Sequence, residues 1–128
     1  MSNQNSMRTP LKTVRGLGSA KSGVHHWWTQ RVSALAMIPL MIWAVFTVAQ
    51  LPGLTFEEAR SLVSHPLNAT LFLLFLITGF WHASLGLQVV IEDYVSGEGR
   101  RMMAILGIKM LLVLLGALSV FSVLQIAL

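Results

Sequence analysis

The sequence predicts an all-α integral membrane protein, a bundle of three transmembrane helices. Apolar residues make up 55% of the 128 residues and charged residues only 11%, whereas an ordinary soluble domain carries roughly 25% charged residues. A soluble chain this short could not hide so much apolar surface, because a small domain buries only about two-thirds of its surface. Three apolar runs are each long enough to cross a bilayer core of about 30 Å, which takes roughly 20 residues.

The first span is expected at about residues 30–52 and is expected to be retained rather than cleaved. Residues 32–53 carry no charge. This run is longer than the roughly 7–15 apolar residues of a signal peptide and lacks a small-residue cleavage site. Trp27 and Trp28 precede it, where an aromatic belt is expected. Pro39 lies inside the run and frees the carbonyl of Leu35, which predicts a kink.

The second and third spans are expected at about residues 66–91 and 102–127. Each contains one basic or titratable residue, His82 in the second and Lys109 in the third. The connections are short, and glycines interrupt the second of them. Residues 22–128 would therefore form one transmembrane domain. Residues 1–21 are polar and form an N-terminal arm, which either extends along the cytoplasmic face or a partner, or is a disordered basic tail near anionic lipid.

The basic residues predict the orientation of the spans. Eight of the nine lie in the N-terminal segment, in the second connection or close to it, and only Arg60 lies in the first connection. The eight are Arg8, Lys12, Arg15, Lys21, Arg31, Arg100, Arg101 and Lys109. By the positive-inside rule, the N-terminus and the second connection face the cytoplasm.

His82 is the strongest indication of chemistry. It lies nine residues before Ile91, about 13 Å inside the second span. An ionisable side chain at that depth is costly and suggests a function. Gly79 and Gly86 share its helical face. Two interpretations remain open: close helix packing with a hydrogen bond from His82 to a neighbouring helix, or a haem ligand on a face smoothed by glycines.

Three polar residues lie at the cytoplasmic level. Asp93 follows His82 by eleven residues, about three turns, and so shares its face; Tyr94 offers a phenolic donor beside it. Both are also typical of an ordinary helix end. Arg31 could reach lipid headgroups or pair with an anion between helices, such as a haem propionate. His25 and His26 are adjacent and would point apart, which is poor spacing for a shared metal.

The remaining composition excludes several chemistries. There is no cysteine, so disulfides, iron–sulfur clusters and thiolate metal sites within this chain are excluded. No phosphate loop, paired catalytic carboxylates or Ser/His/Asp arrangement is evident. The chain alone does not resemble an enzyme. A transporter would usually need repeats or broken helices, and neither is evident.

Two stretches resemble the succinate dehydrogenase hydrophobic membrane anchor subunit family. They are SGVHHW with QRVSAL, at residues 22–27 and 30–35, and HASLGLQVVIEDYV, at residues 82–95. In the second, a histidine is followed by glycine at plus four and by Asp-Tyr at plus eleven and plus twelve. The resemblance runs from Ser22 to the C-terminus, although the third span is generic apolar helix.

The resemblance implies a non-catalytic subunit of a succinate dehydrogenase (quinone) complex of the tricarboxylic acid cycle and electron transport. This chain would be half of a heterodimeric membrane anchor, paired with the cytochrome b subunit and docking the iron–sulfur and flavoprotein subunits among membrane phospholipid. His82 matches an axial ligand of haem b iron, and Arg31 a position near the propionates. Tyr94 and Asp93 match the ubiquinone site.

Two alternatives stay open beside this expectation. One is the anchor subunit of a fumarate reductase, and the other is a non-redox membrane scaffold in which His82 only packs. The expected location is the bacterial inner membrane, because no Arg- and Ser-rich transit peptide is evident; the mitochondrial inner membrane is the second choice.

Overall fold

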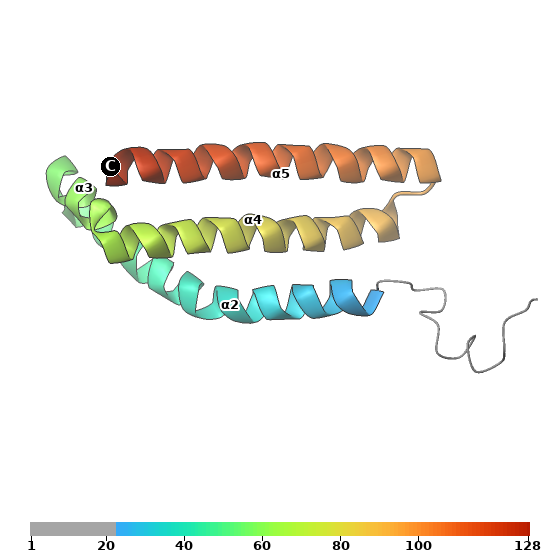
Figure 1. Ribbon diagram of the computed structural model, residues 1–128, viewed down its shortest axis with the longest axis horizontal. Helices are drawn as coiled ribbons and strands as arrows, with labels where there is room; N and C mark the ends of the chain where they lie inside the picture. The colour runs from blue at the N-terminus through green and yellow to red at the C-terminus, as the bar shows by residue number, and fades with distance from the viewer. Residues whose placement is uncertain (1–22) are drawn as a thin grey trace, which may run out of the picture.

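Residues 23–128 are described by a computed structural model. Their elements, in chain order, are α2 (Gly23–Gln50), the 3-10 turn η1 (Leu51–Gly53), α3 (Phe56–Ser64), α4 (Pro66–Tyr94) and α5 (Glu98–Ala127). The three long helices lie side by side, with α4 between α2 and α5 and in contact with both (Figure 1). The prediction of an all-α bundle with three membrane-spanning helices is confirmed. The arm predicted at residues 1–21 lies outside the described residues.

The long helices extend beyond the apolar runs. They contain 28, 29 and 30 residues, which at 1.5 Å per residue is about 42–45 Å. That length covers a bilayer including its headgroup regions. The helices continue past the hydrocarbon because every backbone polar group must stay bonded until water is reached. The chain is a multi-pass membrane protein.

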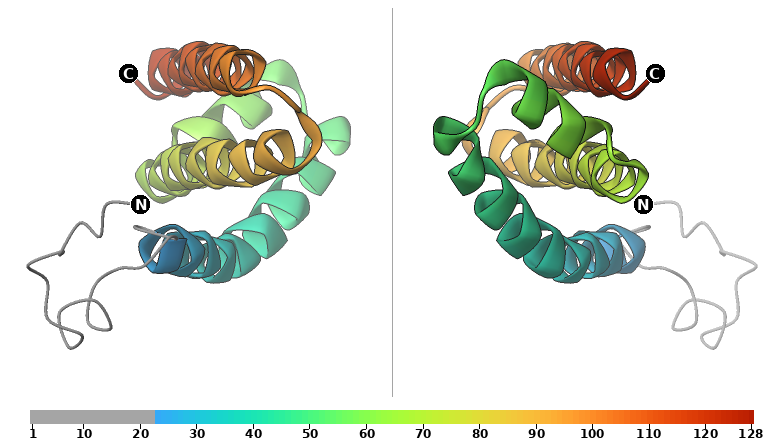
Figure 2. Two further views of the ribbon diagram at one scale, coloured as in Figure 1. Left: turned by 90° about the vertical axis from the view of Figure 1, so that its right-hand side faces the viewer. Right: turned by 90° about the vertical axis from the view of Figure 1, so that its left-hand side faces the viewer.

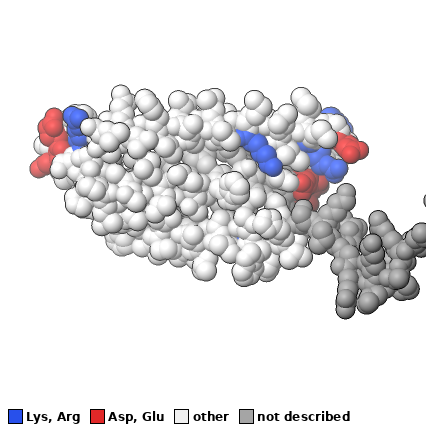
Figure 3. Space-filling view, in the orientation of Figure 1, with Lys and Arg blue, Asp and Glu red and all other residues white. Residues whose placement is uncertain are grey.

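The surface of the bundle is the reverse of a soluble protein's. Among residues 23–128 the buried ones are small or weakly polar, namely Ser33, Ala44, Thr47 and Ala69. Large apolar side chains face outward instead. The small residues between the helices allow the backbones to approach closely, which is common in membrane proteins. Charged side chains gather at the two ends of the bundle, and the flank between is largely uncharged (Figure 3).

Helix α2 is bent, and its second half curves toward α3 and the start of α4 (Figures 1 and 2). Pro39 lies within it, and a proline removes one helical hydrogen bond and clashes with the preceding turn. The bent half is held by an edge-to-face contact between Trp43 and Phe72 of α4, with ring centroids 4.7 Å apart. The kink predicted from Pro39 fits this bend.

The short helix α3 was not predicted; residues 54–65 were expected to be only a connection. A capping box begins it. Thr55 Oγ1 accepts from the Glu58 backbone N–H, and the Glu58 carboxylate accepts from the Thr55 N–H at 2.8 Å and from its hydroxyl at 2.7 Å. The signature Thr-x-x-Glu could have revealed this helix.

The capping box predicts a pH dependence of α3. The backbone N–H and then the hydroxyl of Thr55 lower the pKa of Glu58 below its usual 4.5. A carboxyl whose folded pKa is depressed stabilises the fold above its unfolded pKa, and that contribution is lost as pH falls through the folded value. Hydrogen-exchange protection of the Thr55 amide should therefore hold from pH 7 to about 5 and fall below 4.5. Glu58→Gln should flatten this profile; a decline of equal size in the variant would contradict the assignment.

The turn between α4 and α5 depends on one glycine. Gly97 has φ +89°, a backbone conformation that L-residues adopt only with strain. Because this turn is only three residues long, α5 returns directly alongside α4. The C-terminal end of α4 and the start of α5 therefore lie at the same end of the bundle as the start of α2 (Figure 1).

Candidate functional site

His82 lies on the face of α4 that meets α2. Its Nδ1 is 2.9 Å from the Ser33 hydroxyl, and its Nε2 is 3.4 Å from the side-chain nitrogen of Gln30. Ser33 is buried, and its hydroxyl donates to the Gln30 backbone carbonyl at 3.0 Å. The imidazole is thus held by two residues of another helix, 49 and 52 positions away in the sequence.

This chain of contacts is compatible with the Nδ1-protonated tautomer of His82. The Ser33 hydroxyl can donate its single proton to the Gln30 carbonyl at 3.0 Å and accept from Nδ1–H at 2.9 Å. In this tautomer Nδ1 carries the imidazole proton. Nε2 is left with its lone pair, touched only by a long contact from the Gln30 amide. A neutral imidazole whose other nitrogen donates to a fixed partner is the form that ligates metals.

His82 lines a cavity of about 740 Å³ between α2 and α4. Ligand pockets commonly measure roughly 300–1,000 Å³. The lining residues are Gly23, His26, Trp27, Gln30, Arg31, Ala34, His82, Gly86, Gln88, Val89 and Glu92. The cavity therefore runs from His82 toward the end of the bundle where α2 begins.

Two buried polar atoms in the lining have no hydrogen-bond partner, His26 Nε2 and Gln30 Oε1. An unsatisfied buried polar atom costs about 1–3 kcal/mol unless something supplies a partner. Gly86 lies close to Gln30, since a Cβ there would be 3.4 Å from the Gln30 amide nitrogen. An imidazole in the lining and a cavity of cofactor size fit a haem-like group.

Arg31 lines the same cavity as His82, so two of the four predicted site residues are brought together. It is exposed, and its guanidinium lies 5.3 Å from the centre of the Trp27 ring, a cation–π contact that fixes its position. It lies between Gln30 and Ser33 in the sequence, so it is at the same level of the bundle as the two residues that contact His82. The positive charge is therefore in the lining of the cavity, close to the level of His82.

Asp93 and Tyr94 lie elsewhere. They end α4, both are exposed, and neither lines the cavity. Tyr94 is 84% exposed. Their neighbour Glu92 lines the cavity instead and accepts from the Gln88 amide at 2.8 Å. Any site that uses Asp93 and Tyr94 is thus on the surface at this end of the bundle and open to further chains.

Sequence reasoning missed Ser33, Gln30 and His26 as parts of the site. His26 was interpreted only as an interfacial residue, yet it is half-buried and lines the cavity, whereas His25 is exposed. Gln30 and Ser33 are three residues apart, so they share a face of α2. A polar pair on an otherwise apolar span could have indicated that face. Within residues 23–128 no group of three metal-ligating side chains forms.

The fold and the cavity define a small multi-pass membrane protein in which two helices line an open cavity that includes an imidazole. The chain belongs to the family described as the succinate dehydrogenase/fumarate reductase transmembrane subunit, whose sequence profile matches residues 5–116. The resemblance found in the sequence is confirmed.

Curated relatives agree with this family. The succinate dehydrogenase hydrophobic membrane anchor subunit of Rickettsia bellii is 33% identical, over 84% of this chain and 86% of the relative. The subunit of the same name from Paracoccus denitrificans is 37% identical, over 73% and 72%. The succinate dehydrogenase membrane anchor subunit of Reclinomonas americana is 31% identical, over 71% and 78%. No solved structure matches the chain.

Proposed function

We propose that this chain is the membrane anchor subunit of a succinate:ubiquinone oxidoreductase, in which it co-ligates haem b and helps to form the ubiquinone reduction site. The observation that carries the proposal is the His82 imidazole, which is held by Ser33 at Nδ1 and lines a cavity of cofactor size between α2 and α4. The relatives' names favour succinate dehydrogenase over the fumarate reductase that the family description also covers.

Within this proposal each residue of the cavity has a stated task. His82 would ligate the iron of haem b together with a ligand from the cytochrome b subunit, and Ser33 would hold the ring in the ligating tautomer. Arg31, which lines the same cavity, would neutralise a propionate. Haem b, when bound, supplies one-electron transfer.

The quinone is assigned to the exposed end of α4. The Tyr94 hydroxyl donates a hydrogen bond to a quinone carbonyl oxygen, and the bond strengthens as negative charge develops there during reduction. Asp93 or water beside it delivers protons from the cytoplasm. Because both side chains are exposed here, the walls of the site come from the cytochrome b and iron–sulfur subunits. The distribution of the basic residues supports a cytoplasmic location for this end.

The whole proposal is tested by purifying the affinity-tagged chain from membranes in mild detergent. It should bring with it flavoprotein, iron–sulfur and cytochrome b subunits, and the preparation should reduce ubiquinone when succinate is added. Recovery of the chain with other partners and without succinate-dependent activity would refute the function. A complex that instead reduces fumarate efficiently from a low-potential quinol would favour the fumarate reductase alternative.

Arg31→Ala tests the propionate contact. Loss of a nearby positive charge disfavours the reduced haem, which carries one more electron, so the haem midpoint potential should fall. A partly exposed pair contributes up to about 1 kcal/mol, which corresponds to a decrease of about 40 mV for one electron. The measurement is a potentiometric titration of the haem spectrum, with Arg31→Lys as the charge-retaining control. An unchanged potential in Arg31→Ala would assign the guanidinium to lipid headgroups.

A further inference from the structure

A second cavity, of about 530 Å³, lies between α4 and α5 and is separate from the pocket of His82, which faces α2. Six residues of each helix line it at alternating spacings of one and three, the pattern of a single helical face. They are Leu76, Ile77, Phe80, Trp81, Ser84 and Leu85 of α4, and Lys109, Leu112, Val113, Gly116, Ala117 and Val120 of α5. We call it the α4–α5 groove.

The α4–α5 groove is long, narrow and almost wholly apolar. It extends nine residues along α4 and eleven along α5, about 14–16 Å at 1.5 Å per residue. The hydrocarbon core is about 30 Å thick, so the groove is about as long as one leaflet is thick. Gly116 lets the helices approach closely at its back, since a Cβ there would lie 3.3 Å from the Phe80 ring.

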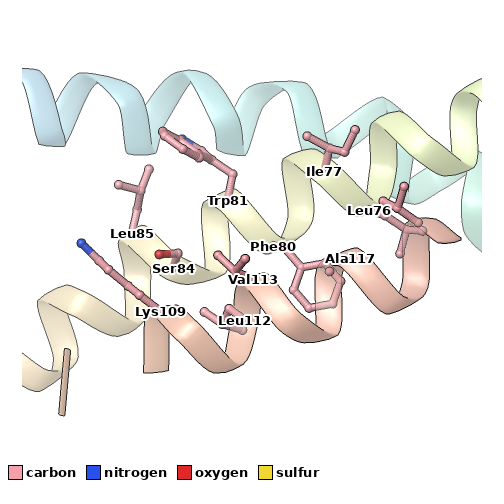
Figure 4. Close-up of a pocket in the computed structure, with 12 residues that line it drawn as sticks. Leu76, Ile77, Phe80, Trp81, Ser84, Leu85, Lys109, Leu112, Val113 and Ala117 are labelled. Carbon is pink, nitrogen blue, oxygen red and sulfur yellow. The ribbon is translucent and has the colours of Figure 1, made fainter. Parts of the chain in front are cut away.

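Lys109 lies at the end of the groove nearest the α4–α5 turn and is the only charged residue in the groove's lining. Its side chain runs from α5 alongside Leu85 and Ser84, with its nitrogen directed toward that end of the bundle (Figure 4). It is half-buried. The acid of its own helix, Glu98, is eleven residues back, about 16 Å along the axis. A cation this far inside a membrane needs an anion from outside the groove.

We propose that the α4–α5 groove binds one acyl chain of an anionic phospholipid, with the lipid phosphate paired to the Lys109 ammonium. The length of the groove and its apolar walls match one acyl chain. The Lys109 side chain is directed toward the end of the bundle near the α4–α5 turn, where it can extend to an anionic headgroup. This inference requires only that the chain spans a membrane and does not rest on the proposed function.

Native mass spectrometry of the protein, purified in mild detergent with the subunits that accompany it, tests the proposal. Phosphatidylglycerol and phosphatidylcholine with matched chains are titrated against delipidated protein. The wild-type protein should bind phosphatidylglycerol more tightly than phosphatidylcholine. Lys109→Gln should weaken its binding about fivefold, the ratio that corresponds to about 1 kcal/mol per basic residue near an anionic group. Lys109→Arg should retain the binding.

Two further variants separate the groove from general surface charge. Ala117→Leu fills the groove without changing the charge and should also weaken phosphatidylglycerol binding. Arg101→Gln removes a cation at the same end of the bundle but outside the groove and should leave the binding unchanged. Equal affinity of wild type for the two lipids, or full retention by Lys109→Gln, would overturn the proposal and indicate that a protein carboxylate meets Lys109. The wild-type comparison decides the question even where a variant fails to assemble.

Discussion

His82→Ala should abolish the b-type haem signal in the reduced-minus-oxidised spectrum of the purified complex. Partners that only orient a ligating histidine contribute roughly 10–100-fold to metal affinity, so removal of the ligand itself should exceed that loss. The half-buried imidazole of His82 is the one titratable ring in the part of α4 that lines the cavity. Subunit composition is measured in the same preparation, because loss of assembly would also remove haem.

Ser33→Ala is the matched control for this prediction. It deletes the acceptor of the Nδ1 proton and leaves Nε2 in place. The haem should remain visible but bind about tenfold more weakly or shift in potential. Identical haem spectra in wild type and His82→Ala would move the ligand to another residue. Absence of haem from both would leave a three-helix scaffold in which His82 and Ser33 join α2 to α4, the packing interpretation of the sequence.

The parts of the fold that were predictable are those governed by the bilayer. A span must be apolar over about 20 residues, so the three long helices could be read directly, and Pro39 indicated the bend in α2. Helix α3 was missed because nine residues is below the length at which helical periodicity is informative. Its signal was the Thr55–Glu58 capping box, which depends on two side chains only.

The site was predictable residue by residue but not as an arrangement. His82 was identifiable because an ionisable group within a span is rare. Its partners Ser33 and Gln30 were not, because a pair 49 or 52 positions apart depends on how α2 and α4 rotate against each other. Eleven-residue spacing placed Asp93 on the face of His82, yet the cavity includes Glu92 and ends before Asp93. The cavity lies between α4 and α2. Residue spacing along α4 alone could not reveal which side of α4 faces α2.

Tyr94→Phe should lower quinone reductase turnover about tenfold or more while leaving the haem spectrum unchanged. The substitution removes one phenolic donor, and a hydrogen bond to a group that becomes charged contributes about 1.5–3 kcal/mol. Because Tyr94 is 84% exposed and outside the cavity of His82, its loss should neither open a void nor disturb the haem. Changes at such surface positions usually stay within about 0.5 kcal/mol of stability.

The assay is steady-state reduction of ubiquinone by succinate, compared with reduction of an artificial acceptor that takes electrons from the iron–sulfur subunit. Only the quinone reaction should slow in Tyr94→Phe, because the donor acts at the quinone oxygen and not earlier. Trp28→Phe, a change on an exposed residue at the same end of the bundle, is the control and should leave both rates unchanged. If Tyr94→Phe kept wild-type turnover and quinone affinity, the phenol would have no part in quinone reduction, and Tyr94 would be an ordinary interfacial residue at the end of α4.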